Sequence, residues 1–258
     1  MNSTPVTVRF SDFAGIPTVS DNDPQSASPR GCAVRFHLAK HVHTDIVAHS
    51  VDAFPTRSVE GFLEFINALV AIAPAGPHPN AIEQFLGAHP AALTFVQTPK
   101  PIPTSFAKES FFAVSAFMFT NADGVSRHGR YRLLPVAGNE YLDEAAAAAQ
   151  GPNFLFDEIR ERVATDPVRF HIAPCSWPGT ATPLMTPLSA GPRIALSWSF
   201  GEISLNEVTA NNAAEQQRMI FDPIPRVDGI AASADPLFEP RANIYLMAGR
   251  RRRAAAEQ

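Results

Sequence analysis

Alternating apolar and polar positions run through much of the chain and predict β-strands. In such segments every second side chain faces the core and its neighbours face outward. The residues involved are rich in Val, Ile, Phe and Thr, which favour strands. The segments are residues 6–10, 32–38, 44–48, 111–120, 127–134, 168–173 and 193–205.

Residues 111–134 predict a β-hairpin. Between the two alternating segments lie Asn121, Ala122, Asp123 and Gly124. Asn, Asp and Gly tolerate the left-handed backbone conformation that tight turns require. The turn therefore joins two neighbouring antiparallel strands.

Helical spacing of apolar residues appears in other parts of the chain. Within residues 58–73 the apolar positions repeat every three or four residues, and Ser58 stands where an N-cap is expected. Further helices are expected at residues 80–86, 154–163 and 212–219 and near the C-terminus, at residues 236–253.

The order of these elements predicts an α+β fold. Strands come first, helices are inserted or appended, and no β-α-β alternation is present. This order favours an antiparallel β-barrel with inserted and C-terminal helices. We expect one domain over residues 1–258, with the barrel core at about residues 5–205 and the last helix packed onto it.

Composition narrows the possible partners. The chain has 258 residues, 45% of them hydrophobic and 18% charged, and a formal net charge of −4. It lacks the overall basic footprint of nucleic-acid-binding proteins and any run of about 20 apolar residues that could span a membrane. Its first residues lack the charged-then-apolar pattern of a secretory signal, so the chain as written is expected in the cytoplasm.

The two cysteines, Cys32 and Cys175, are far apart in sequence and form no metal-binding motif. Each is expected to be a small buried apolar residue. A single disulfide between them is the alternative.

The C-terminal helix carries the most informative chemistry. Arg241 and Tyr245 lie one helical turn apart on the same face, and Arg252 returns to nearly that face two turns later. A nearby positive charge favours the ionised form of a phenol, and a phenolate is a suitable ligand for haem iron. The spacing therefore predicts a haem site with Tyr245 on the iron. The alternatives are a Tyr that only packs and a solvated arginine run at residues 250–253.

Several further motifs resemble one family in the same order along the chain. They are Val8-Arg9-Phe10-Ser11, Arg30-Gly31-Cys32-Ala33-Val34-Arg35-Phe36, Asp45-Ile46-Val47-Ala48-His49-Ser50, Phe54, Phe221-Asp222-Pro223 and the Arg241-to-Arg252 segment. Together they resemble the haem catalase superfamily, and more closely its short branch, the catalase-related peroxidases. The resemblance covers essentially the whole chain.

The resemblance implies haem b as cofactor and a set of residues that bind it. Tyr245 is then the axial iron ligand, Arg241 polarises it, and Phe54 packs against the macrocycle. Arg9 and Arg252 are similar to the residues that bind the haem carboxylates, because a guanidinium matches a carboxylate in bidentate fashion. Without the resemblance, Arg9 would be interpreted as a strand-edge charge paired with a local acid such as Asp12.

Two departures from the family pattern concern the peroxide side. The family's distal His lies upstream of the strand that here begins at Val8, so the sequence as written lacks it, and Ser11 lacks the His it would support. A start assigned too late would explain this, and a periplasmic location would then also be open. His49 occupies the position of the family's distal Asn, so we expect His49 to act on peroxide, with a purely structural His as the alternative.

The resemblance implies a haem peroxidase that reduces H2O2 or organic hydroperoxides with an external organic reductant and has at most weak catalase activity. One alternative is a haem-binding protein with little turnover, because the distal His segment is absent. Another is hydroperoxide rearrangement, as in allene oxide synthases, which also use a proximal Tyr. We expect a monomer or a homodimer.

Overall fold

The computed structural model describes residues 3–13, 18–23, 26–72, 76, 78–176, 194–195 and 199–255. Its strands are β1 (Val6–Ser11), β2 (Gly31–Ala39), β3 (Val42–His49), β4 (Phe111–Phe112), β5 (Phe117–Thr120), β6 (Ser126–Pro135), β7 (Val168–Ser176), β8 (Ile194–Ala195), β9 (Gly201–Leu205) and β10 (Ile230–Ala232). Its α-helices are α1 (Val59–Val70), α2 (Ala81–Ala88), α3 (Pro90–Gln97), α4 (Glu144–Ala148), α5 (Phe154–Thr165), α6 (Asn212–Arg218) and α7 (Phe238–Ala255).

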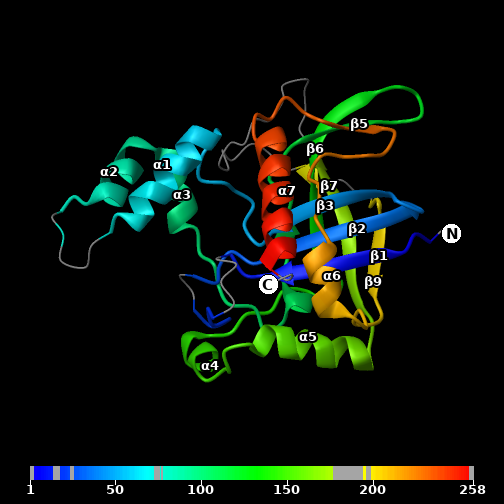
Figure 1. Ribbon diagram of the computed structural model, residues 1–258, viewed down its shortest axis with the longest axis horizontal. Coiled ribbons are helices and arrows are strands. Elements are labelled where there is room, and N and C mark those ends of the chain that lie inside the picture. Colours follow the sequence, from blue (N-terminus) through cyan, green and yellow to red (C-terminus); the bar gives the residue numbers. More distant parts are fainter. Residues whose placement is uncertain are drawn as a thin grey trace.

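The described strands form one antiparallel sheet (Figure 1). Its main path runs β1-β2-β3-β4-β6-β5-β10, while β7 pairs with β6, β8 and β9. The predicted α+β class with an antiparallel sheet is confirmed. Helices α3 and α4 and strand β10 have no counterpart in the elements expected from the sequence, because they are short and their apolar spacing is weak.

The sheet does not close into the expected barrel. Within the described residues, β1 pairs only with β2 and β9 pairs only with β7. A cavity of about 1050 Å³ lies between these two edge strands and is lined by both. Side chains from β1, β9 and α5 face this space, so the backbones of the two edges do not meet.

The predicted hairpin is confirmed in β5 and β6. Phe117 lies opposite Gly129, and the side chain of Asn121 accepts a hydrogen bond from the backbone N–H of Val125 at 2.8 Å. Gly124 has a φ of 77°, which is the left-handed conformation expected for the turn.

The first strand of the hairpin is interrupted. Phe112 lies opposite Arg132 and Phe117 opposite Gly129, so residues 113–116 face only residues 130–131 on β6. Such an excess of residues is a bulge, which re-aims side chains at that point. One of the residues in this bulge is Ser115, whose side chain contacts α7.

The two faces of β1, β2 and β3 differ in character. One face carries Val8, Phe10, Val34 and Ile46 and joins the main apolar core, which α5 covers through Phe156 and other side chains. Cys32 belongs to the same core and is a buried free thiol. The opposite face carries polar residues and is the side on which α7 lies (Figure 1).

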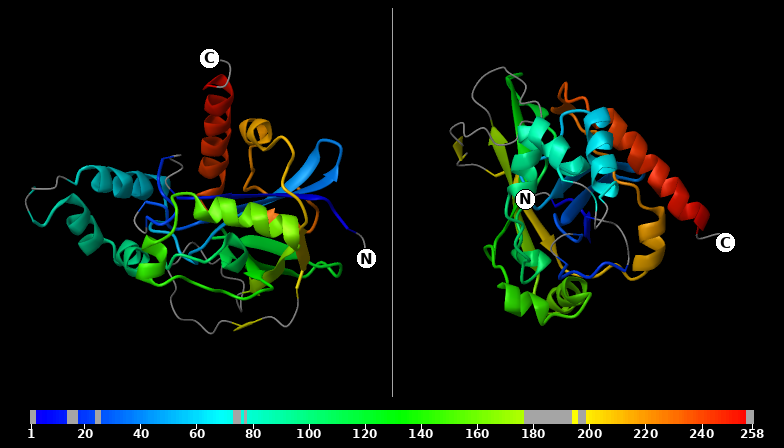
Figure 2. Two further views of the ribbon diagram at one scale, coloured as in Figure 1. Left: turned by 90° about the horizontal axis from the view of Figure 1, so that it is seen from below. Right: turned by 90° about the vertical axis from the view of Figure 1, so that its left-hand side faces the viewer.

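Helices α1, α2 and α3 form a separate group beside the sheet (Figure 1). The expected cap of the first helix is confirmed, since the backbone N–H of Gly61 donates to the Ser58 hydroxyl at 3.1 Å. Helix α7 begins against the sheet, and its C-terminal end lies away from it (Figure 2). In the part of the chain that the structure describes, no helix is both long and apolar enough to cross a membrane.

Candidate functional site

Three adjacent strands place Ser11, Gly31 and His49 in one row. Ser11 lies opposite Gly31 on β2, and Gly31 lies opposite His49 on β3. Directly opposed residues of antiparallel strands project from the same face of the sheet. Gly31 has no side chain, and the Ser11 hydroxyl lies in the space that a Cβ atom at Gly31 would occupy. The row therefore has no side chain at its centre, and the Ser11 hydroxyl lies over Gly31.

A second row of the same face lies two residues further along each strand. Here Arg9 lies opposite Ala33, and Ala33 lies opposite Val47. In these two rows the middle strand β2 presents only Gly31 and Ala33. We infer that the centre of the face has room for a flat ligand, because almost no side chain rises from it.

The segment before α7 docks at the end of this face. Arg35 and Asp45 form an ion pair across β2 and β3, with an N–O distance of 2.7 Å. Asp45 also accepts the backbone N–H of Asp222 at 2.8 Å, and Arg35 donates to the carbonyl oxygen of Ile220. In α7, Gly249 packs against Ile220 where a larger residue would collide. These contacts hold α7 over the polar face.

On α7, Arg241 connects Tyr245 to the sheet. One guanidinium nitrogen of Arg241 donates to the Tyr245 hydroxyl at 3.2 Å, and the other donates to the Ser115 hydroxyl at 2.8 Å. Ser115 is buried in the bulge between β4 and β5. The predicted pairing of Arg241 with Tyr245 on one helix face is thus present. Ser115 was missed, and its only sequence signal is a hydroxyl residue within an apolar strand segment.

Arg9 presents a guanidinium group without an acidic partner among the described residues. It lies over the Phe221 ring, 4.6 Å from the centroid, and Arg35 lies over the same ring at 5.2 Å. Asp12, the partner expected on sequence grounds alone, is bound to Arg30 instead. Burial and then the charge of Arg252 lower the pKa of Arg9 from its ordinary value. A group in this situation favours an anionic ligand.

Arg252 lies on the exposed part of α7. It donates to the carbonyl oxygen of Met219 at 3.0 Å, and its charge acts on Arg9. The two arginines expected to bind carboxylates are therefore neighbours, although one comes from β1 and the other from the C-terminal helix.

His49 is held as a neutral ring. Burial and then the charge of Arg241 lower its pKa from 6.5 to about 3. Its Nδ1 atom accepts the backbone N–H of Val51 at 3.4 Å. Since Nδ1 is the acceptor in the neutral ring, we assign the proton to Nε2. His49 is thus set up to donate a hydrogen bond rather than to accept a proton.

Phe54 lies in a different environment from the other expected residues. Its ring is 5.0 Å from that of Phe62, and it packs with Val59, Val114 and Leu237. This cluster joins α1 to the start of α7. The structure therefore brings together Arg9, Ser11, His49, Arg241, Tyr245 and Arg252 around one face, and places Phe54 beside the base of α7.

The cavity between β1 and β9 meets this site only at Arg9. Tyr245, Arg241 and His49 do not line it. Among the described residues, no group of three or more His, Cys, Asp or Glu side chains could hold a metal ion.

Comparison with known proteins shows the family of the chain. Residues 1–166 match the family model described as catalase. The chain is 30% identical over 247 residues to a catalase-related peroxidase of Mycolicibacterium paratuberculosis, a match that covers 95% of this chain and 76% of that protein. It is 29% identical over 250 residues to a catalase-related peroxidase of Synechococcus elongatus, covering 95% of this chain and 72% of that protein.

A solved bacterial catalase has the same fold. The superposition has a TM-score of 0.80 at 21% sequence identity and covers 96% of this chain and 50% of the catalase. The chain thus spans about half the length of that catalase. These matches confirm the predicted resemblance to the short peroxidase branch, the catalase-like fold and the class of oxidoreductases that act on peroxide.

Proposed function

Since the chain belongs to the catalase family, we propose that it binds haem b and reduces H2O2 or organic hydroperoxides with electrons from an external organic reductant. Residues 1–258 then form a single haem-binding domain. Bound haem supplies the redox chemistry that cleaves the O–O bond. The residues of the chain bind it, orient the peroxide and control protons.

One observation carries this proposal: the contact between Arg241 and the Tyr245 hydroxyl, at 3.2 Å. A phenolate is a good ligand for ferric iron, and a hydrogen bond from a guanidinium to its oxygen fixes the position of that ligand atom. Arg241 is itself held by the buried hydroxyl of Ser115. Tyr245 therefore has a fixed positive partner at the oxygen that would bind the iron.

The polar face of the sheet fits the haem macrocycle and its carboxylates. Gly31 and Ala33 place no large side chain at the centre of the face, as a flat macrocycle requires, and a Cβ atom at Gly31 would collide with the Ser11 hydroxyl. Arg9 has no acidic partner among the described residues, and the nearby Arg252 adds a second guanidinium. These two arginines would bind the haem carboxylates.

On the peroxide side, His49 and Ser11 have separate roles in this proposal. The Nε2–H of His49 donates a hydrogen bond to a peroxide oxygen, since Nδ1 is occupied by the Val51 N–H. The Ser11 hydroxyl, which lies over Gly31 in the same row, can accept and donate a hydrogen bond. Together they orient a peroxide that binds against the polar face of the sheet.

A second candidate is a haem-binding protein with little turnover. The observation in its favour is the pKa of His49, which burial lowers to about 3. A ring with this pKa is a poor base at neutral pH. Of the described groups in the row of Ser11, Gly31 and His49, none is then a strong proton acceptor.

Hemin titration followed by an activity assay tests the proposal. The purified protein should develop a sharp Soret band at one equivalent of hemin and then oxidise a phenol when peroxide is added. Tyr245→Phe should weaken hemin binding about 100-fold, or by about 3 kcal/mol, because the iron loses its anionic ligand. Tyr141→Phe, which removes a hydroxyl bound to Glu109 at 3.0 Å, is the matched control.

Three outcomes separate the hypotheses. Hemin binding that Tyr245→Phe leaves unchanged would contradict the ligand assignment. A Soret band with phenol oxidation no faster than that of free hemin would favour the haem-binding protein. A band together with peroxide-dependent oxidation that needs the folded protein supports the peroxidase.

A further inference from the structure

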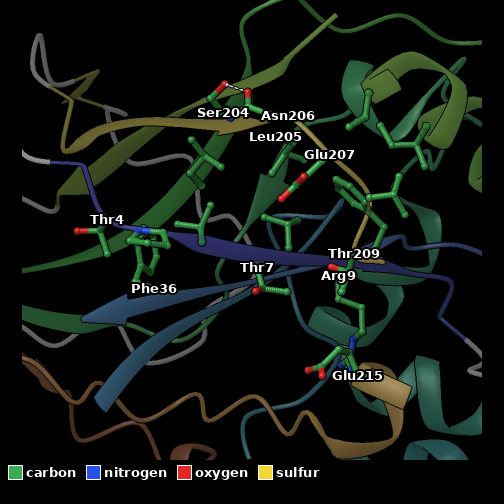
Figure 3. A pocket seen from close by; sticks show the side chains of 18 of the residues that line it. Thr4, Thr7, Arg9, Phe36, Ser204, Leu205, Asn206, Glu207, Thr209 and Glu215 are labelled. Atoms are coloured by element: carbon green, nitrogen blue, oxygen red, sulfur yellow. Dashed lines mark hydrogen bonds between the residues drawn. The ribbon is translucent and has the colours of Figure 1, made fainter. Parts of the chain in front are cut away.

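We propose that the cavity between β1 and β9 binds the electron donor of the reaction, an aromatic reductant that carries a positive charge. This inference rests on the proposed peroxidase function and deepens it. The cavity has a volume of about 1050 Å³ and is lined by β1, α5, β9 and α6, with the segments that flank them (Figure 3). A single aromatic molecule with a short side chain fits within this volume.

The floor of the cavity is apolar. Val8 and Phe10 of β1, Ile159 and Val163 of α5 and Ile203 of β9 contribute to it. The two β1 side chains pack against the main core yet remain partly exposed, because the cavity lies beside them. Burying an aromatic ring here would remove apolar surface from water on both partners.

The unpaired side chains at the rim of the cavity carry a net negative charge. Figure 3 shows Glu207, after β9, and Glu215, on α6, at the cavity. Within the described residues neither carboxylate has an ion pair or a side-chain hydrogen bond. Arg9 also lines the cavity and has no ion pair among the described residues, so it offsets one of the two carboxylates and leaves one negative charge. The remaining charged side chains are engaged, since Arg160 pairs with Asp157 at 2.9 Å and Glu202 lies 3.9 Å from Arg169. An occupant with a positive group would therefore be favoured.

Arg9 joins the cavity to the haem site. Its side chain and that of Glu215 extend toward the same part of the cavity (Figure 3). Arg9 also belongs to the arginine pair that would bind the haem carboxylates. A donor in the cavity would thus lie next to the carboxylate edge of the macrocycle.

The reaction consumes two donor molecules for each peroxide. With a phenol AH, the balance is ROOH + 2 AH → ROH + H2O + 2 A•. The O–O bond breaks, and each phenol loses one electron and one proton as its O–H bond breaks. One of the two oxygen atoms leaves in the alcohol and the other in water. Tyramine, a phenol with an ammonium group, has the chemistry that the cavity favours.

Two phenols of similar size and opposite charge test the inference: tyramine and 3-(4-hydroxyphenyl)propionate. In the hemin-loaded protein, Glu207→Gln combined with Glu215→Gln should raise the KM for tyramine about fivefold. The KM of tyramine should thereby move closer to that of the anionic phenol. Glu64→Gln removes an exposed carboxylate from α1 and should change neither value. Leu205→Trp, which fills the cavity from β9, should raise the KM for both phenols.

Calorimetry of tyramine binding to the protein without hemin gives a second readout. Binding that weakens in the double glutamine variant, with a normal Soret band and an altered KM in the loaded protein, supports the inference. A normal Soret band with an unchanged tyramine KM overturns it. If the wild-type protein forms no Soret band with hemin, the proposed function fails. Tyramine binding that is equal in the wild type and the double variant would then also reject the cavity as a cation-selective aromatic site.

Discussion

The α7 side of the candidate site and the β1–β3 side are built in different ways. On α7, Arg241 and Tyr245 are one turn apart, so the helix itself brings them into contact at 3.2 Å. On the sheet, Ser11 and His49 belong to strands that are not neighbours, and only the register through Gly31 aligns them. One side depends on local geometry and the other on pairing between distant segments.

This difference shows which part of the site the fold holds in a fixed position. The α7 side consists of direct hydrogen bonds from Ser115 through Arg241 to Tyr245. The sheet side consists of the Ser11 hydroxyl, which lies over Gly31, and an imidazole whose pKa is lowered to about 3. We infer that the site is organised more firmly for holding an iron ligand than for moving a proton.

A side chain at Gly31 should displace the Ser11 hydroxyl and disrupt the sheet side with the largest effect. Gly31→Val places a branched side chain where the Ser11 hydroxyl now lies. We expect hemin affinity to fall about 10- to 100-fold, in line with the roughly 1–3 kcal/mol cost of overpacking. A Soret titration measures this. Gly87→Ala, where nothing lies within 4 Å of the added atom, is the control. An equal loss of hemin affinity in both variants would refute the role of Gly31 in the site.

Removing the His49 imidazole should have a smaller effect. It should change the rate of phenol oxidation and leave hemin binding unchanged. His49→Ala should lower the rate of phenol oxidation about tenfold through the lost hydrogen bond, with hemin content unchanged. His49→Asn, which keeps an N–H donor, should retain more activity than His49→Ala. Equal rates for wild type and His49→Ala would reduce His49 to a structural residue.

The same donor role predicts a specific pH dependence. A ring with a pKa of about 3 stays neutral at any pH well above that value, because it would gain a proton only near pH 3. The His49-dependent part of the rate, measured as wild type minus His49→Ala, should therefore be flat between about pH 5 and 8. A fall in this part of the rate near pH 6.5 would contradict the neutral assignment.

The smallest effect is expected on the α7 side. Ser115→Ala removes one hydrogen bond to Arg241, which keeps its contact with Tyr245. Hemin affinity should drop about threefold to tenfold, corresponding to about 1 kcal/mol for a neutral hydrogen-bond partner. Ser126→Ala, on the exposed end of β6, is the matched control. A hemin affinity that stays at the wild-type value would show that Arg241 needs no anchor.

The sequence predicted the local features of this molecule and missed the non-local ones. The Arg241–Tyr245 pair, the Ser58 cap and the turn at Gly124 follow from spacing within a few residues, and all three are present. The role of Ser115 depends on a bulge between β4 and β5, and the open edges of β1 and β9 depend on the whole sheet. Register and bulges arise from distant partners, so a single segment carries little sign of them.

The partner of a charged residue was equally hard to predict. On the sequence alone, Asp12 was the expected partner of Arg9, because they are three positions apart. In the fold Asp12 binds Arg30, and Arg9 is left beside Phe221 and Arg252. The choice is decided by where the loop between β1 and β2 places Arg30.

The vibrational spectrum of the hemin-loaded protein tests the central claim most directly. Resonance Raman excitation in the iron–phenolate charge-transfer region should show the modes of a coordinated tyrosinate, and Tyr245→Phe should lack them while Tyr141→Phe keeps them. A spectrum without phenolate modes in the wild-type protein, or one that Tyr245→Phe leaves unchanged, would contradict the account.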